Sequence, residues 1–252
     1  LASASSASAQ LGPDSVVPGQ TQFTEKVLVQ GLEGPWEITW GPDDYLWVTE
    51  RTAGRITRIN PEDGSRHPAI TIEEVSAPGG QDGLLGMALH PDLLKGTGND
   101  YVYTAYTYVD QARGPDPSVK DPQSPYRFLY TKIVRLTYDE GTLQLSDPVD
   151  LITGLPASND HNSGRLKFGP DDRLYYTIGD QGNNQLGNWC IPTEAQRLPT
   201  ADEISAGNYI AYVGKSLRLN PDGSIPDDNP ELDGVRSHVF TYGHRNMQGI
   251  DI

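Results

Sequence analysis

A histidine and two aspartates form the stretch of this sequence whose residue types most clearly suggest chemistry. Asp160 and His161 stand directly ahead of one alternating segment, and Asp180 follows the segment that returns after the turn at 169–172. A strand–turn–strand of this length brings its two ends back to one edge of a sheet, so His161 and Asp180 should lie close together. An imidazole oriented by a carboxylate is a common general base. The alternative is that these residues are only polar parts of ordinary turns.

The composition limits the kinds of partner. With 19 Lys and Arg against 34 Asp and Glu among 252 residues, the formal charge is −15, which disfavours nucleic acid and anionic membrane surfaces. No apolar run reaches the ~18 residues of a membrane helix. The single cysteine, Cys190, excludes an internal disulfide. The 27 glycines and 20 prolines predict many turns and short elements, which favours an all-β fold.

The first 20 residues differ from the rest. Residues 1–20 are mostly Ala, Ser, Gly, Pro and Gln, a composition typical of disorder. Residues 7–9, Ala-Ser-Ala, have the small-x-small form of a signal-peptidase site. We expect residues 1–20 to be an export remnant or a flexible leader, residues 21–252 to form the folded domain, and the protein to be periplasmic or secreted.

A strand pattern with a Pro-Asp turn occurs three times. The turns fall at Pro42, Pro91 and Pro170, and a base period near ~50 residues, lengthened by loops, is typical of β-propeller blades. The strands predicted for the first copy are 35–40, 45–50 and 54–59. Those for the second are 85–89, 101–105 and 133–138, and those for the third are 166–168, 174–178 and 214–219. Residues 248–252 resemble the first strand of a fourth copy. Three blades and a fragment cannot close a ring, so we expect the chain to be part of a larger folding unit.

Two long loops and one acidic loop interrupt this pattern. The insertion at 181–213 is long enough to form a lid or wall, and Thr200 with Glu203 has the spacing of a capping box that starts a short helix. The proline-rich loop at 114–126 is expected on the surface. Residues 222–230 have the composition of a calcium loop but depart from the EF-hand pattern, so a solvated turn is the better interpretation.

Polar residues gather where loops lead into the blades. A propeller places such residues at the mouth of its central channel. There Gln81, Asp160, His161, Asp180 and the Arg245-Asn246 pair would offer a base, carboxylates, amides and a guanidinium. This set suits a polyhydroxylated substrate and an anionic cofactor. The sequence lacks a Walker loop, a zinc motif, a Gly-x-Ser-x-Gly elbow and a dinucleotide fingerprint.

Five collinear motifs resemble one known family. They are G-G-Q-D-G-L-L-G at 79–86, D-H-N-S-G-R-L at 160–166, Y-Y-T-I-G-D-Q-G-N-N-Q-L at 175–186, L-R-L-N-P-D-G-S-I-P-D-D-N-P at 217–230 and G-H-R-N-M-Q-G at 243–249. Through them, from about residue 23 onward, the chain resembles the soluble pyrroloquinoline-quinone (PQQ)-dependent glucose dehydrogenases of the glucose/sorbosone dehydrogenase family. The resemblance implies a six-bladed β-propeller, of which this chain would supply about the N-terminal half.

The resemblance also implies roles for single residues. His161 matches the general base that takes the proton of the sugar C1 hydroxyl, while hydride passes from C1 to the quinone and a lactone forms. Asp180 matches the carboxylate that holds the imidazole. Arg245 matches a catalytic group that stabilises the developing oxyanion, and with Asn246 it matches the quinone-binding edge. Three residues match contacts to the sugar: Gln81, Asp160 and Gln185.

The implied partners are PQQ, Ca²⁺, an aldose sugar, an external electron acceptor and a second copy in a homodimer. The calcium ligands and the remaining PQQ contacts are expected beyond residue 252. Met247 stands where the family usually has proline. Two other functions stay open: a non-catalytic propeller scaffold, against which the base and its carboxylate argue, and a calcium-dependent propeller lactonase, against which the motif match argues.

Overall fold

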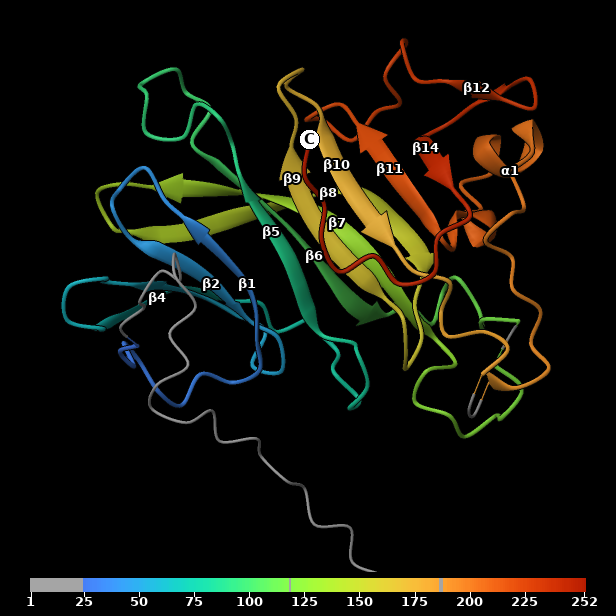
Figure 1. The fold of residues 1–252 in the computed structure, drawn as a ribbon, viewed down its shortest axis with the longest axis horizontal. Coiled ribbons are helices and arrows are strands. Elements are labelled where there is room, and N and C mark those ends of the chain that lie inside the picture. The colour runs from blue at the N-terminus through green and yellow to red at the C-terminus, as the bar shows by residue number, and fades with distance from the viewer. Residues whose placement is uncertain (1–24, 118, 186–187) are drawn as a thin grey trace, which may run out of the picture.

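The computed structural model describes residues 25–117, 119–185 and 188–252, which form three four-stranded antiparallel sheets (Figure 1). The first sheet contains β1 (Pro35–Trp40), β2 (Leu46–Glu50), β3 (Arg55–Ile59) and β4 (Arg66–Thr71). The second contains β5 (Leu84–Leu89), β6 (Tyr101–Val109), β7 (Leu129–Asp139) and β8 (Gln144–Pro156). The third contains β9 (Ser163–Phe168), β10 (Leu174–Ile178), β11 (Lys215–Leu219) and β14 (Val239–Tyr242). In each sheet the strands lie side by side in chain order.

The inner three strands of each sheet confirm the predicted repeat, and each sheet has a fourth, outer strand beyond the three of that repeat. The start of β4 and the first half of β8 are largely exposed to water, so these strands lack the alternation of apolar and polar residues that marks a half-buried strand. The all-β class is confirmed. The described sheets form consecutive blades that do not close into a ring.

Two of the three Pro-Asp turns, in the first and third sheets, carry an aspartate that fastens the turn to the third strand of its sheet. Asp43 accepts a hydrogen bond from Arg58 at 2.7 Å and from the indole of Trp47 at 2.9 Å. In the third sheet, Asp171 accepts from Arg218 at 2.8 Å in the same way. The repeat in the sequence therefore reflects an ion pair in the structure as well as a turn.

The sheets pack face to face with two apolar layers between them. Trp47 and Ile56 of the first sheet pack against the second through Met87 and Tyr106. On the opposite face of the second sheet, a separate buried cluster joins it to the third sheet through Tyr103, Ile133, Leu166, Tyr176 and Leu217. Burial of this apolar surface is what holds consecutive blades together.

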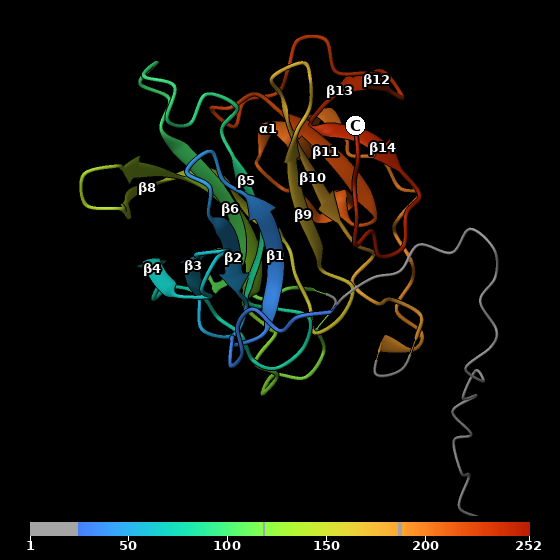
Figure 2. The same ribbon diagram turned by 60° about the vertical axis from the view of Figure 1, so that its left-hand side comes forward.

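The innermost strands approach one another so closely that glycine is required. Figure 2 shows β1, β5 and β9 following one another, and β5 contacts both of its neighbours. A Cβ atom at Gly86 of β5 would clash with the carbonyl oxygen of Gly164 in β9. Beside these strands lies a cleft of about 530 Å³, across which Arg165 pairs with Glu37 at 2.5 Å.

The insertion and the acidic loop take defined structures. The insertion contains the helix α1 (Ala201–Ser205) and the 3-10 turn η2 (Ile210–Tyr212), and both bonds of the Thr200–Glu203 capping box are present, which confirms that prediction. The acidic loop leads to the hairpin β12 (Glu231–Leu232) and β13 (Val235–Arg236). Its Asp228 pairs with Arg218 at 2.8 Å, so this carboxylate serves an ion pair.

The prediction of a fourth-copy strand at 248–252 is wrong for this structure. These residues form no ladder hydrogen bonds and run alongside β9 (Figure 1). Arg165 Nε donates to the Gln248 carbonyl at 3.0 Å, and Lys167 pairs with Asp251. A strand needs a backbone partner, and here the contacts come from side chains.

Two further expectations concern the N-terminal segment and membrane-spanning helices. The leader predicted at 1–20 lies outside the described residues, so it stays a prediction. Residues 25–34 form no strand and lead into β1. Among the residues that the structure describes, no helix is long and apolar enough to span a membrane.

One buried histidine makes the stability of the third sheet depend on pH. His238 is 5% exposed; its Nε2 donates to the Gly223 carbonyl at 3.1 Å, so its Nδ1 accepts from the Tyr212 hydroxyl at 3.0 Å. Burial lowers the pKa of His238 from 6.5 to about 4. The unfolded chain therefore binds a proton as the pH falls below 6.5, whereas the folded chain does so only near pH 4.

Between pH 7 and pH 4, we expect the intact protein to lose about 3 kcal/mol more unfolding free energy than a His238→Gln variant. The stabilisation is complete above the unfolded pKa and disappears as the pH falls toward the folded pKa. Denaturant titrations of both proteins at the two pH values measure the difference. Equal losses of unfolding free energy in the two proteins would contradict this prediction.

Gly86→Ala should destabilise the intact protein by about 1–3 kcal/mol, because the new methyl group must push β5 away from β9. Gly249→Ala is the control, since no atom lies within 4 Å of a Cβ built there. Thermal and denaturant unfolding would show the effect. A Gly86→Ala protein as stable as the control variant would mean that the inner strands can separate freely.

Candidate active site

Four loops meet at one edge of the second and third sheets, at the lower ends of β5, β9 and β10 in Figure 1. They are residues 79–83 ahead of β5, 158–162 ahead of β9, 179–185 after β10 and 243–248 after β14. Backbone hydrogen bonds join them: the Gln81 amide donates to the Asn159 carbonyl at 2.9 Å, and the Asp180 amide donates to the Arg245 carbonyl at 2.8 Å. The loops therefore form one connected rim.

A chain of three side chains crosses this rim. His161 Nδ1 lies 2.7 Å from Asp180 Oδ1, and Arg245 Nη1 donates to Asp180 Oδ2 at 2.6 Å. The Asp180 side chain is 1% exposed, whereas those of His161 and Arg245 are 13% and 50% exposed. A buried carboxylate thus orients an accessible imidazole on one side and a half-exposed guanidinium on the other.

The contacts of His161 assign its tautomer. Nδ1 faces a carboxylate, which can only accept, so Nδ1 carries the proton. The Gln185 amide nitrogen lies 3.1 Å from Nε2 and also donates to Asp160 Oδ2 at 2.7 Å, while its oxygen accepts from Arg245. This set of partners fixes the orientation of the amide, so Nε2 is the accepting atom. Nε2 is the position at which a substrate hydroxyl could replace the Gln185 amide.

The remaining predicted residues complete the same network. Gln81 Nε2 donates to Asp160 Oδ1 at 2.7 Å, and Gln81 Oε1 accepts from the His161 amide at 3.1 Å. Asn246 Nδ2 donates to the same Gln81 oxygen at 3.3 Å. The structure therefore brings together all seven residues singled out from the sequence: Gln81, Asp160, His161, Asp180, Gln185, Arg245 and Asn246. Their chemical roles stay predictions.

The backbone around the imidazole is strained. His161 and Gln181 have φ values of 49° and 64°, in the left-handed region that costs a non-glycine residue about 1–3 kcal/mol. Two glycines permit the close packing of this loop: a Cβ at Gly80 would clash with the Asn159 carbonyl, and one at Gly179 with the His161 carbonyl. Such strain is typical of residues held for function.

Sequence reasoning missed the residues that support this network. Asn162, which is 2% exposed, donates to the carbonyls of Gln81 at 3.0 Å and Ser158 at 2.7 Å. Ser163 Oγ donates to Asn246 Oδ1 at 3.1 Å. Asn162 and Ser163 belong to the D-H-N-S motif, so their position next to His161 was the available signal. Ser158 lies outside every motif, so the sequence gave no signal for it.

The charges at the rim suit an anionic ligand beside a proton acceptor. The half-exposed guanidinium of Arg245 and the amide of Asn246 are the donors that could meet carboxylate or quinone oxygens. Among the described residues, no three His, Cys, Asp or Glu side chains are grouped as metal ligands. Arg245 and Asn246 therefore offer a partial anion site.

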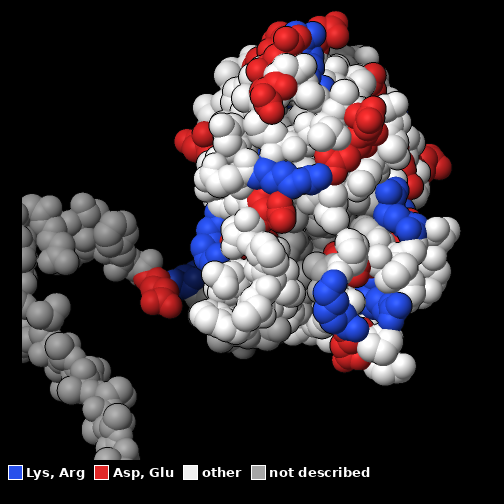
Figure 3. Space-filling view, turned by 90° about the vertical axis from the view of Figure 1, so that its right-hand side faces the viewer, with Lys and Arg blue, Asp and Glu red and all other residues white. Residues whose placement is uncertain are grey.

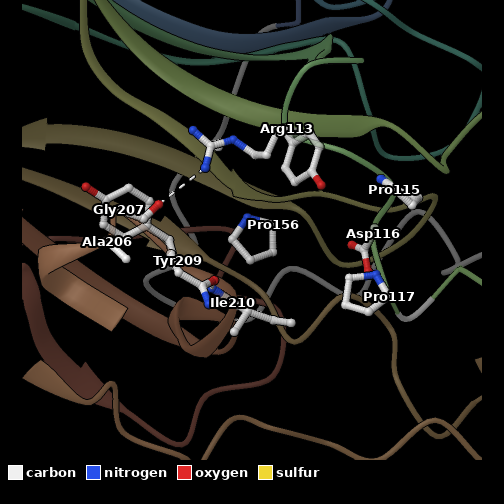
Figure 4. Close-up of a pocket in the computed structure, with 12 residues that line it drawn as sticks. Arg113, Pro115, Asp116, Pro117, Pro156, Ala206, Gly207, Tyr209 and Ile210 are labelled. Atoms are coloured by element: carbon white, nitrogen blue, oxygen red, sulfur yellow. Dashed lines mark hydrogen bonds between the residues drawn. The ribbon is translucent and has the colours of Figure 1, made fainter. Parts of the chain in front are cut away.

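A separate cavity of about 360 Å³ lies between the proline-rich loop and the segment from α1 to η2 (Figure 4). Arg113 Nη1 donates to the Gly207 carbonyl at 3.3 Å across it, and Tyr130, Pro156 and Tyr209 are among its walls. None of the seven network residues lines this cavity.

The charged surface agrees with the acidic composition. On the face drawn in Figure 3, Lys and Arg side chains are interspersed with Asp and Glu side chains rather than gathered into one basic patch. That pattern on this face differs from the basic stripe of a nucleic-acid-binding surface.

Comparison with known proteins gives matches along almost the whole chain. The family model described as Glucose / Sorbosone dehydrogenase matches residues 32–252. Quinoprotein glucose dehydrogenase B of Acinetobacter calcoaceticus is 47% identical over 229 residues, which are 90% of this chain and 45% of that protein. Aldose sugar dehydrogenase YliI of Escherichia coli is 28% identical over 227 residues, 89% of this chain and 52% of that protein.

Solved structures of sugar dehydrogenases also match most of this chain. The PQQ-bound form of aldose sugar dehydrogenase from Streptomyces coelicolor is 31% identical with a TM-score of 0.65, covering 88% of this chain and 54% of that one. The apo form of the soluble aldose sugar dehydrogenase from Escherichia coli is 25% identical with a TM-score of 0.64, covering 88% and 54%. The chain thus spans about half the length of the relatives that it matches.

In the intact protein without ligands, we expect ¹H–¹⁵N spectra to show neutral His161 protonated at Nδ1 and bare at Nε2, because Asp180 can only accept. Asp180→Ala removes that acceptor and should abolish the preference. The solvent-facing His67, replaced by Gln, serves to assign the signals. A native His161 protonated at Nε2 would refute the assignment.

Proposed function

The chain belongs to the glucose/sorbosone dehydrogenase family, and we propose that its protein is a PQQ-dependent oxidoreductase that converts the C1 hydroxyl of an aldose sugar to the lactone. The observation that carries the proposal is the His161–Asp180 pair, 2.7 Å apart, with Nε2 of the imidazole turned toward the rim. The printed names of the relatives, a quinoprotein glucose dehydrogenase and aldose sugar dehydrogenases, support the same activity.

In this proposal His161 is the general base. Its Nε2 accepts the proton of the C1 hydroxyl, which replaces the Gln185 amide at that atom. The imidazolium that forms keeps its Nδ1–H bond to Asp180, whose negative charge stabilises it. Because Asp180 also binds Arg245, the pair is held in place before the substrate arrives.

Three residues would hold the sugar. A sugar hydroxyl both donates and accepts, so it can bind the amides of Gln81 and Gln185 and the carboxylate of Asp160 at once. These side chains already bond one another at 2.7 Å, and a sugar would exchange those bonds for its own. The site should therefore reject molecules without hydroxyl groups, because such molecules would leave the polar atoms of these side chains unpaired.

Arg245 and Asn246 would hold the anionic PQQ. The fit rests on the half-exposed guanidinium of Arg245, whose charge complements carboxylate and quinone oxygens. When bound, PQQ supplies the acceptor for the hydride that leaves C1. Calcium is a further cofactor of the proposal, with ligands expected beyond residue 252.

We further propose that the complete protein is a six-bladed propeller, exported to the periplasm or secreted, that passes electrons to an external acceptor. The length of the relatives supports the additional blades. Ile38 and Trp40 of β1 are 62% and 56% exposed, which suits an additional blade packed against the first sheet. A homodimer stays a prediction from the resemblance.

Replacing His161 by Asn in the intact, PQQ- and Ca²⁺-loaded protein should lower kcat by about 10²–10⁴-fold with little change in PQQ affinity. His67→Asn, at an exposed position of β4, is the control and should keep full activity. The readout is bleaching of the quinone absorbance on addition of glucose or another aldose.

A His161→Asn protein that kept most of its activity would refute the mechanism. PQQ binding without reduction by any aldose would refute the substrate class. No PQQ binding would favour the scaffold, and lactone hydrolysis without quinone would favour the lactonase.

A further inference from the structure

A lysine without a carboxylate partner is buried behind the rim. Lys215, the first residue of β11, is 0% exposed, and none of the ion pairs found among the described residues includes it. Its Nζ donates to three backbone carbonyls, those of Ala195 at 2.7 Å, Val213 at 2.8 Å and Glu194 at 3.4 Å. Three N–H donors of an ammonium thus meet three acceptors. An unpaired buried charge is costly, so its retention requires a reason.

One of these carbonyls connects Lys215 to the loop that carries Arg245. The Ala195 oxygen that accepts from Lys215 also accepts from the Gly243 amide at 2.9 Å. A Cβ built at Gly243 would lie 2.6 Å from Gln196 Nε2, so the two segments are in close contact. Lys215 therefore fixes the insertion, and the insertion fixes the start of the 243–248 loop.

The next residues of the 243–248 loop are linked by backbone hydrogen bonds to the segment that carries Asp180. The His244 amide donates to the Gly214 carbonyl at 3.0 Å, and the Gly214 amide donates to the Gly179 carbonyl at 2.8 Å. The Asp180 amide then donates to the Arg245 carbonyl at 2.8 Å. A displacement of the insertion would therefore shift both the Arg245 guanidinium and the Asp180 carboxylate, which bind each other.

We propose that Lys215 is a positioning residue: its protonated ammonium fastens the insertion to the 243–248 loop and so holds Arg245 against Asp180. It touches neither sugar nor cofactor. The effect on activity rests on the proposed function, whereas the effect on the loop does not.

Charge makes this role testable by pH. Burial lowers the pKa of Lys215 to about 8; the nearby Arg197 guanidinium lowers it further, and the Glu194 carboxylate raises it. His244 also faces it, and the pKa of His244 is lowered by burial and by Lys215. Above pH 8 the neutral amine keeps only two N–H groups for three carbonyls. The attachment should therefore weaken as the pH rises through about 8.

The first test uses the intact protein without sugar or cofactor. Hydrogen exchange of the amides at 243–246, corrected for the intrinsic rate, should show protection falling about tenfold or more between pH 7 and pH 9. Lys215→Met should show the low protection at both pH values, and Lys215→Arg, which stays charged, should show the high protection at both. Lys95→Met, with a side chain 62% exposed, is the control and should match the wild type.

If Lys215→Arg does not fold, because a guanidinium is larger, the Met variant alone decides. The proposal would be overturned if the 243–246 amides of Lys215→Met were as protected as those of the wild type. It would also be overturned if their protection in Lys215→Met fell with pH as it does in the wild type.

The second test is activity against pH in the loaded protein. The wild type should lose kcat/KM above pH 8, and Lys215→Arg should lack that alkaline limb. An unchanged limb in Lys215→Arg would overturn the proposal. If no sugar is oxidised by any variant but the exchange pattern is as expected, the proposed function fails while the positioning role stands.

Discussion

The buried carboxylate of Asp180 is the constraint on which the rim depends. At 1% exposure it cannot rely on water, so the protein supplies its partners: the imidazole of His161, the guanidinium of Arg245 and the amide of Gly182. Each partner comes from a different segment, and none can move without leaving a buried charge uncompensated. The geometry of the base and of the cationic donor is thus set by one side chain.

The part of the site that could be predicted is the part built by local geometry. β9 and β10 pair with Leu174 opposite Phe168 and Ile178 opposite Ser163, which returns the chain to the edge where it began. His161 and Asp180, just outside this hairpin, must then be neighbours. The inner strands of the blades were predictable for the same reason, since alternation and a Pro-Asp turn are local signals.

The rest depends on contacts between distant segments or on features that have no pattern. Gln81 and Asn246 were placed at the rim by the propeller repeat and given roles by the family resemblance, because nothing local shows that they meet His161. The outer strands β4 and β8 lack alternation, and residues 248–252 have a strand-like sequence but no backbone partner. The His161 carbonyl packs closely against Gly179 and the Asn159 carbonyl against Gly80, and these are contacts between distant segments that no local pattern shows.

The bond between Asn246 and Gln81 joins positions 165 residues apart, and it has a consequence for biosynthesis. A chain emerging from the ribosome can form the first two sheets, each with its own local contacts, long before Asn246 has been made. The base and its carboxylate can pair once the third sheet forms, but the cationic edge comes last. The rim is therefore complete only after Gln81 and Asn246 have both been synthesised and brought together, so a ligand that needs this edge can bind only after that point.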